Sequence, residues 1–542
     1  MKFRFPAICA LLLCLAASAA GQGYTRDYQF VYDTNPYLNL HNPAAISFWN
    51  GKIATAAVSF EKADGGLRDI NESPDSWEVV AGTESYYRVS DLVSFHGKLA
   101  WSDFSGKDMG GPILMDPDYN PVAFYELNET TLGTKQRELY TIGGDIALNL
   151  GRRWGLGLGV SYQAGDQTKI KDPRFSNVWM DLDVNAGITF LAADWLTLGA
   201  GFRWRNTLEN VKGHIYGTTD KQYYICTDKG GFFGTVSELS GDYSYVPDST
   251  PRPMNNDWLG GSFQAVLFGG LFSNELSLYK RDGYYGKKSS TTATFFEFGQ
   301  GKNSNTFIDN LKGGMKAGYD AMLLFPAGQS IFRAALSLGY ETLITNENQF
   351  RYSTPEGGNT VVEYTGANQV GDWKKRSASA DLRWMAGIDG DRASATVGLK
   401  GGWDSMKQTT TVYPFWHVHS IKHYNAELYF QKNVRALDNI FTLYASAFGL
   451  MGQGKKKNDG TYMEGASSTA IRTFDNYLDK HYEAETARRA GGSLAVTYTR
   501  LIGSSFAPWI KVSESFTTLL SNPEFLEGKT RNILTVSLGC TF

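Results

Sequence analysis

The sequence predicts an all-β fold, a closed antiparallel transmembrane β-barrel of about 18 strands, with 14 to 18 possible. Three observations predict it. Segments of about 12 residues alternate between apolar residues and small or polar residues. The chain of 542 residues combines 59 glycines with 14% aromatic residues. After residue 20 there is no run of about 18 apolar residues, which excludes helices that cross a membrane.

Residues 1–20 have the pattern of a secretory signal peptide. Lys2 and Arg4 form a basic start, residues 7–17 are apolar, and residues 18–20 are small. The apolar run is shorter than the roughly 20 residues that a membrane-spanning helix needs. We therefore expect residues 1–20 to be removed from the mature protein.

Residues 21–50, ahead of the first expected strand, are too aromatic for a solvated tail. The predicted barrel is so wide that wall side chains alone would not fill its lumen. Two interpretations stay open: a plug folded inside the lumen, or a periplasmic segment packed under the barrel. The residues singled out for the plug are Asn42, Pro43, Ala44, Phe48 and Trp49.

The barrel itself is expected to span residues 51–542. Strands of one direction are predicted near 51–62, 92–104, 154–166, 195–207, 274–286, 330–343, 392–404, 438–450 and 506–518. Strands of the opposite direction are predicted near 78–89, 138–151, 177–190, 261–272, 313–325, 376–388, 421–433, 487–500 and 531–542. The alternation is weakest at 51–62, 78–89 and 274–286, so a smaller number of strands is possible.

The predicted hairpin around the turn at 151–153 shows the alternation clearly. Leu156, Leu158 and Val160 alternate with glycines at 155, 157 and 159. A soluble sandwich would bury the apolar face, whereas a membrane barrel turns it toward lipid. The barrel is favoured because the strands exceed the usual five or six residues, and because aromatic residues such as Trp154 mark strand ends.

The connections between strands differ in length at the two ends. Short links are predicted at 151–153, 191–194, 326–329, 389–391, 434–437 and 501–505. Long links are predicted at 105–137, 208–260, 287–312, 344–375, 405–420 and 452–486. Short periplasmic turns and long extracellular loops are typical of outer-membrane barrels. Aromatic residues in the 208–260 loop are interpreted as a lid packed on itself or as a surface for sugars or a partner protein.

The last strand, 531–542, resembles the C-terminal signal by which the barrel-assembly machinery recognises its substrates. Leu534, Val536 and Leu538 point to one side, and the strand ends on the aromatic Phe542. Together with the signal peptide, this strand predicts the cell outer membrane as the location and the lipid bilayer as the surroundings.

Charge and cysteine content exclude several other classes of protein. The net charge of -3 gives no basic surface for nucleic acid. Cys226 and Cys540 are placed at opposite ends of the barrel, so they should not form a disulfide. The inner face of the predicted wall mixes signs, which suits internal ion pairs, a plugged lumen or a weakly selective channel. The lumen charges singled out are Asp181, Asp183, Arg203, Arg205, Asp381 and Arg383.

The histidines are candidates both for metal binding and for catalysis. His417 and His419 lie on one face of an extended segment, and with His423 they have donors for Zn²⁺ or Cu²⁺. No cysteine or carboxylate at close spacing completes that set, so no metal site and no cofactor is predicted. No catalytic triad can be assembled from the spacing of seven histidines, so an enzyme is not predicted either.

Two family resemblances add to this interpretation. The segment 38–45 resembles the Asn-Pro-Ala element of the long-chain fatty-acid transporter superfamily, in which this element belongs to an N-terminal stretch inside the barrel. The aromatic-rich strands and long polar loops resemble the uncharacterised large outer-membrane barrels of Bacteroidetes. These resemblances imply passive transport of a small hydrophobic or amphipathic solute. The alternative is a non-transporting subunit of a larger assembly for protein secretion, barrel insertion or glycan capture, with protein partners bound through the long loops.

Overall fold

A computed structural model describes residues 27–115, 123–127, 131–217, 222–291, 305–354, 360–466, 472–473, 475–503 and 506–542. The predicted signal peptide lies outside the described residues. Across these described ranges, none of the helices has the length and apolar character needed to cross a membrane.

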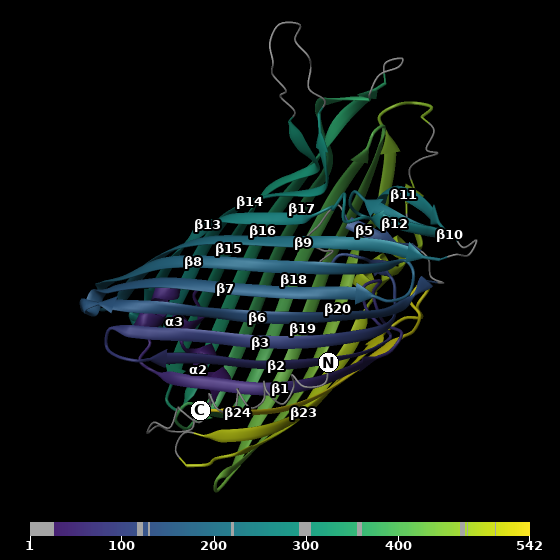
Figure 1. The fold of residues 1–542 in the computed structure, drawn as a ribbon. Coiled ribbons are helices and arrows are strands. Elements are labelled where there is room, and N and C mark those ends of the chain that lie inside the picture. The colour runs from purple at the N-terminus through teal and green to yellow at the C-terminus, as the bar shows by residue number, and fades with distance from the viewer. Residues whose placement is uncertain are drawn as a thin grey trace, which may run out of the picture.

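Eighteen long strands form one antiparallel barrel (Figure 1). The first nine are β1 (Lys52–Asp64), β2 (Asp75–Arg88), β3 (Val93–Met109), β6 (Gly133–Leu150), β7 (Trp154–Lys169), β8 (Arg174–Ala193), β9 (Leu196–Tyr216), β13 (Met254–Leu267) and β14 (Phe272–Ser290). The other nine are β15 (Thr306–Ala327), β16 (Ser330–Ser353), β17 (Val361–Ile388), β18 (Ala393–Val412), β19 (Phe415–Ala436), β20 (Asn439–Thr461), β22 (Arg489–Arg500), β23 (Ala507–Leu519) and β24 (Thr530–Thr541). Each pairs with the next, and β24 pairs with β1, which closes the barrel. The predicted fold class is confirmed, including its three weakest strands.

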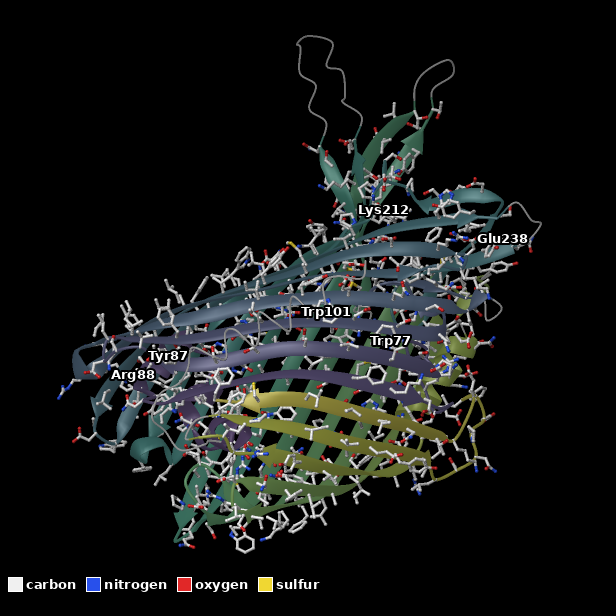
Figure 2. The ribbon with its side chains drawn as sticks, turned by 60° about the horizontal axis from the view of Figure 1, so that its bottom comes forward. Trp77, Tyr87, Arg88, Trp101, Lys212 and Glu238 are labelled. Carbon is white, nitrogen blue, oxygen red and sulfur yellow. The ribbon has the colours of Figure 1, made fainter. Side chains whose placement is uncertain are left out.

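The two ends of the barrel differ as the sequence predicts. One end, here named the turn end, carries the short links, including η3 (Gly151–Arg153) and η4 (Phe268–Gly270). The start of β1 and the end of β24 also lie there. The opposite end is named the loop end. In Figure 2, β2 can be followed from Trp77 on the loop-end side to Tyr87 at the turn end.

The outer surface of the wall is apolar. Leu158, Ile142 and Val178 are each about 60% exposed, although they belong to the middle of long, regular strands. Exposed apolar side chains alternate with buried or half-buried small and polar ones along the same strands. A closed barrel with such a belt contacts a lipid bilayer with its outer face.

Two predicted loops are wrong, because the strands continue through them. The 405–420 link is a hairpin of β18 and β19 in which only residues 413 and 414 stand outside strands. In the 344–375 link, β16 runs on to Ser353 and β17 begins at Val361. Beyond the bilayer both faces of a hairpin can be polar, so the alternation that identifies a strand disappears while the backbone pairing persists.

The true loops at the loop end fold together into what we call the cap. Its sheet contains β4 (Gly111–Pro112), β5 (Ala123–Glu126), β10 (Gln222–Asp228), β11 (Phe233–Ser240) and β21 (Arg472–Thr473). The strand β12 (Asp242–Val246) pairs with β9, and helix α4 (Asp475–Thr486) packs beside β19 and β20. Cap and wall residues share a buried apolar core that includes Ile113, Ile225, Phe232, Tyr285 and Leu478. Cys226 lies in this core and is not bonded to Cys540, as predicted.

The N-terminal segment forms three short helices at the turn end (Figure 1). They are α2 (Tyr28–Thr34), α3 (Pro36–Asn39) and the 3-10 helix η1 (Pro43–Phe48). Asp27, Asn35 and Asn42 cap their N-termini with side-chain oxygens, which explains the starts of these helices. The helix η1 contacts β3, β6, β7, β8 and β9.

Candidate functional site in the barrel lumen

Asn42 fastens the N-terminal segment to the inner face of the wall. Its side-chain amide lies within hydrogen-bond distance of the carbonyl oxygens of Ile188 and Ala200, 3.2 Å away in both cases, and 3.0 Å from Oε1 of Gln264. Its Oδ1 accepts a hydrogen bond from the backbone nitrogen of Ala44 at 2.9 Å. Asn42 is 2% exposed. One side chain therefore joins the segment to β8, β9 and β13.

Four glycines of the wall, named here the glycine seat, make room for this contact. They are Gly155, Gly157, Gly187 and Gly199. A Cβ atom at position 157 would overlap the backbone nitrogen of Ala44, and one at position 187 would overlap the side chain of Asn42. The alternating glycines of β7 thus allow the backbone of Pro43 and Ala44 to lie directly against the wall.

A second anchor joins α2 to the opposite part of the wall through Asp33. Its carboxylate pairs with Arg383 of β17, and its backbone oxygen accepts a hydrogen bond from Nε of Arg333 at 2.9 Å. Arg383 also pairs with Asp381 at 2.5 Å. A further link is the backbone nitrogen of His41, which donates to Glu275 at 2.9 Å. Each carboxylate has a basic or N–H partner, as buried charges require.

The other four lumen charges pair with one another across the hairpin of β8 and β9. Asp181 pairs with Arg205 at 2.7 Å, and Asp183 pairs with Arg203. The guanidinium of Arg205 also lies over the ring of Trp258, 5.1 Å from its centroid. All six predicted lumen charges therefore lie in paired, charge-compensated contacts.

The two aromatic plug candidates pack within the turn end. The rings of Phe48 and Tyr37 stack with centroids 5.6 Å apart. Trp49 is 8% exposed and meets the ring of Tyr86 of β2 edge-on at 6.0 Å. The first contact packs the segment on itself, and the second buries apolar area between the segment and the wall.

The predicted signal residues of the last strand lie on the outer face and at the contact between β24 and β1, here named the seam. Leu534 and Leu538 are 40% and 57% exposed. Phe542 exchanges two backbone hydrogen bonds with Ala54 of β1, at 2.7 and 2.9 Å. This residue therefore completes the seam that closes the barrel.

A cavity of about 450 Å³ lies under the cap, between its loops and the wall formed by β16, β17, β18 and β19. The side chains that line it are unusually rich in histidines and carboxylates. They include Asp69, Asp228, Asp404, His419, His423, His481 and Glu485. The hairpin of β18 and β19, of which residues 405–420 were predicted to be a loop, supplies His419 and His423 to the wall of the cavity.

Asp228 is the most buried acid of this cavity. Its carboxylate accepts hydrogen bonds from the backbone nitrogens of Gly230, Phe232 and Phe233 at 2.9 to 3.3 Å. Burial nevertheless raises the pKa of Asp228 to about 7, since these neutral donors offset only part of the desolvation. The carboxyl group shapes the Gly230–Phe233 turn and titrates near neutral pH.

The three histidines weighed for metal binding do not converge. His417 bonds to Asp459 at 2.5 Å and stacks on Phe233, outside the cavity lining. His423 lies between Asp404 and Glu485, 2.7 Å from each carboxylate. Only His419 and His423 of the three line the cavity. Sequence reasoning missed Asp69, His481 and Glu485. Asp69 is distant in the chain from the other two, whereas the four-residue spacing of His481 and Glu485 was a signal that could have found them.

Solved structures similar to this fold are outer-membrane barrels. A FadL homologue of Pseudomonas aeruginosa matches with 12% identity and a TM-score of 0.30 over 97% of this chain and 96% of its own. The ferric preacinetobactin receptor BauA of Acinetobacter baumannii matches with 6% identity and a TM-score of 0.39 over 90% and 80%. The ferric-catecholate receptor Fiu of Escherichia coli K12 matches with 8% identity and a TM-score of 0.35 over 89% and 81%.

No curated protein matches the chain significantly. The resemblance to Bacteroidetes barrels stays a prediction. Residues 43–542 match the model of one protein family. This range includes the helix η1, which begins at Pro43, and the whole barrel. The chain belongs to that family, the family of unknown function DUF6850.

Proposed function

We propose that this protein is an outer-membrane barrel that passively admits a small hydrophobic or amphipathic solute, and that residues 27–50 are its plug. The observation that carries the proposal is the docking of Asn42 and Ala44 in the glycine seat. A segment that only packed under the barrel would not need wall glycines that admit its backbone so closely.

The remaining lumen contacts support a passive route. The six lumen charges singled out above are paired with opposite charges, so these described residues form no ring of one sign that would select an ion. The cavity of about 450 Å³ between cap and wall has room for a small solute, and its histidines and carboxylates suit the polar group of an amphipathic one. Plug release at the turn end would connect this space to the periplasm.

The test is single-channel conductance of the purified protein in planar bilayers. Deleting residues 27–50 should raise the conductance, and Gly157→Ala should raise the frequency of openings because the new Cβ displaces Ala44. The matched control is Gly401→Ala on β18, where the nearest atom to a new Cβ is the oxygen of Asn425 at 3.8 Å. A deletion variant that inserts normally and conducts no more than the parent would rule out the plug. Uptake of a medium-chain fatty acid into proteoliposomes then tests the solute class.

One observation favours the alternative, a subunit of a larger surface assembly. The strand β17 has 28 residues, whereas about 10 suffice to cross a bilayer, so the β16–β17 hairpin projects from the loop end. Phe350 and Tyr364 of this projection form an aromatic cluster with Phe307 of β15, and the rings of Phe307 and Tyr364 stack 4.3 Å apart. Stoichiometric co-purification of another protein in mild detergent, lost on Tyr364→Ser, would support the scaffold. A sealed monomer that always brings a partner would end the transport proposal.

A further inference from the structure

We propose that the cavity under the cap holds a divalent transition-metal ion, for which Zn²⁺ is the probe, bound by His419, His481, Asp69 and Glu485. Neither the family match nor the proposed transport assigns such a site. The site is built from three separate parts of the chain: the loop between β1 and β2, the helix α4, and the strand β19.

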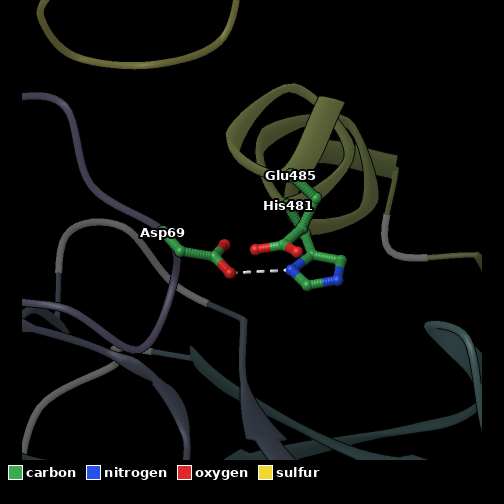
Figure 3. A group of neighbouring side chains, drawn as sticks. All are labelled: Asp69, His481 and Glu485. Atoms are coloured by element: carbon green, nitrogen blue, oxygen red, sulfur yellow. Dashed lines mark hydrogen bonds and ion pairs between the residues drawn. The ribbon is translucent and has the colours of Figure 1, made fainter. Parts of the chain in front are cut away.

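The first observation is the geometry of the cap residues (Figure 3). His481 and Glu485 are four residues apart on α4 and therefore lie on one face of the helix. Asp69 approaches them from the β1–β2 loop, and Nδ1 of His481 lies 2.8 Å from its Oδ2. One ligand atom of each of the three residues lies within 4.8 Å of the other two. A tetrahedral Zn²⁺ site brings its ligand atoms to about 3–3.5 Å of one another, so small side-chain rotations suffice.

The second, independent observation is His419. This side chain is 1% exposed, and its Nδ1 lies 2.8 Å from the backbone oxygen of Lys456. A carbonyl oxygen can only accept, so Nδ1 carries the hydrogen and Nε2 keeps its lone pair. Within the described part of the chain, Nε2 is buried without a hydrogen-bond partner. A histidine oriented in this way by its other nitrogen is the usual form of a metal ligand.

The two imidazoles are at a suitable separation. The ring centroids of His419 and His481 are 6.1 Å apart. Two imidazoles that bind one tetrahedral Zn²⁺ at about 2.0–2.1 Å have centroids about 5.2 Å apart, so an approach of about 1 Å brings the pair to that separation. Both residues line the same cavity, as do Asp69 and Glu485. Two nitrogen and two carboxylate donors form a neutral set with a divalent cation, which lowers the cost of holding the ion away from bulk water.

His423 is a positioning residue for this site. It lies between Asp404 of the wall and Glu485 of the helix, 2.7 Å from each. This chain of contacts holds the Glu485 carboxylate through its Oε2, in the manner of outer contacts that orient ligands at metal sites.

The test is calorimetric titration of ZnCl₂ into the full-length barrel, made without a histidine tag and stripped with chelator. We expect one Zn²⁺ per barrel with micromolar or tighter affinity, and at least tenfold weaker binding for His419→Gln and for His481→Gln. The matched control is His214→Gln, because His214 pairs with Asp242 and lies outside the cavity lining. Heat-modifiable migration on gels confirms that each variant is folded.

Three outcomes would overturn the site. They are no saturable Zn²⁺ binding to the folded parent, unchanged binding in both cavity variants, or an equal loss in the His214 control. X-ray absorption at the zinc edge should report two imidazole ligands in the parent and one in His419→Gln. The Zn²⁺ site does not rest on the proposed function, so a failed conductance test leaves the titration result unaffected.

Discussion

Replacing Asn42 by alanine isolates the contact between plug and wall. The substitution removes the side-chain amide contacts to Ile188, Ala200 and Gln264, and the cap of η1 at Ala44. The amide group has two hydrogens and its oxygen accepts one hydrogen bond, so three hydrogen bonds are lost; at about 1 kcal/mol each they give about 3 kcal/mol in favour of the undocked segment. Because each 1.4 kcal/mol is a factor of ten, the undocked population should rise about a hundredfold.

Hydrogen–deuterium exchange of the peptide covering 43–49 measures this population. In the variant, protection of these amides should fall by about the same hundredfold, while the amides of the barrel strands keep theirs. The matched control is Asn39→Ala, because Asn39 bonds only to Tyr32 and Asn35 within the segment. Equal exchange at 43–49 in both variants and the parent, with a folded barrel, would refute the claim that Asn42 docks the segment.

Three further predictions concern the cap and the seam. Burial raises the pKa of Asp228 from about 4 in the unfolded chain to about 7 in the folded cap. The protonated carboxyl group therefore stabilises the cap below pH 4, and this stability is lost as the pH rises through 7. Asp228→Asn should flatten the pH dependence of cap proteolysis between about pH 4 and 8. Lys169→Met should destabilise the cap by about 3–5 kcal/mol, because it leaves the Glu126 carboxylate, paired at 2.7 Å and almost fully buried, without its cation; adding Glu126→Gln should restore much of the resistance to protease. Deleting Phe542 should lower the heat-modifiable fraction, because the seam loses two hydrogen bonds to Ala54, whereas Phe542→Tyr should not.

The strands could be predicted because the bilayer imposes a simple rule on them. Residues that face lipid must be apolar, so Leu156, Leu158 and Val160 alternate with small inner residues. The tight link at 151–153 is predicted and found at the same residues. That rule ends where the wall leaves the membrane, and therefore the 405–420 hairpin was wrongly predicted to be a loop.

The functional contacts are harder to predict because they join distant parts of the chain. The pairing of Asp181 with Arg205 lies within one hairpin, but it is diagonal, because the register places Asp183 opposite Arg205. His481 and Glu485 are four residues apart on one helix, but no spacing links them to Asp69, since the closed barrel alone brings the first loop next to the last helix. Likewise, the glycines of β7 were identified as inner-face residues, but their contact with Ala44 requires the three-dimensional fold.

The glycine seat has an evolutionary consequence. Even alanine at positions 157 and 187 would overlap the segment around Asn42, so these wall positions and that segment must change together. A relative that loses the Asn-Pro-Ala stretch is released from this constraint and can accept bulkier side chains on the same strands. The size of the residues at four wall positions should therefore distinguish, from sequence alone, family members that carry a docked N-terminal segment from those that do not.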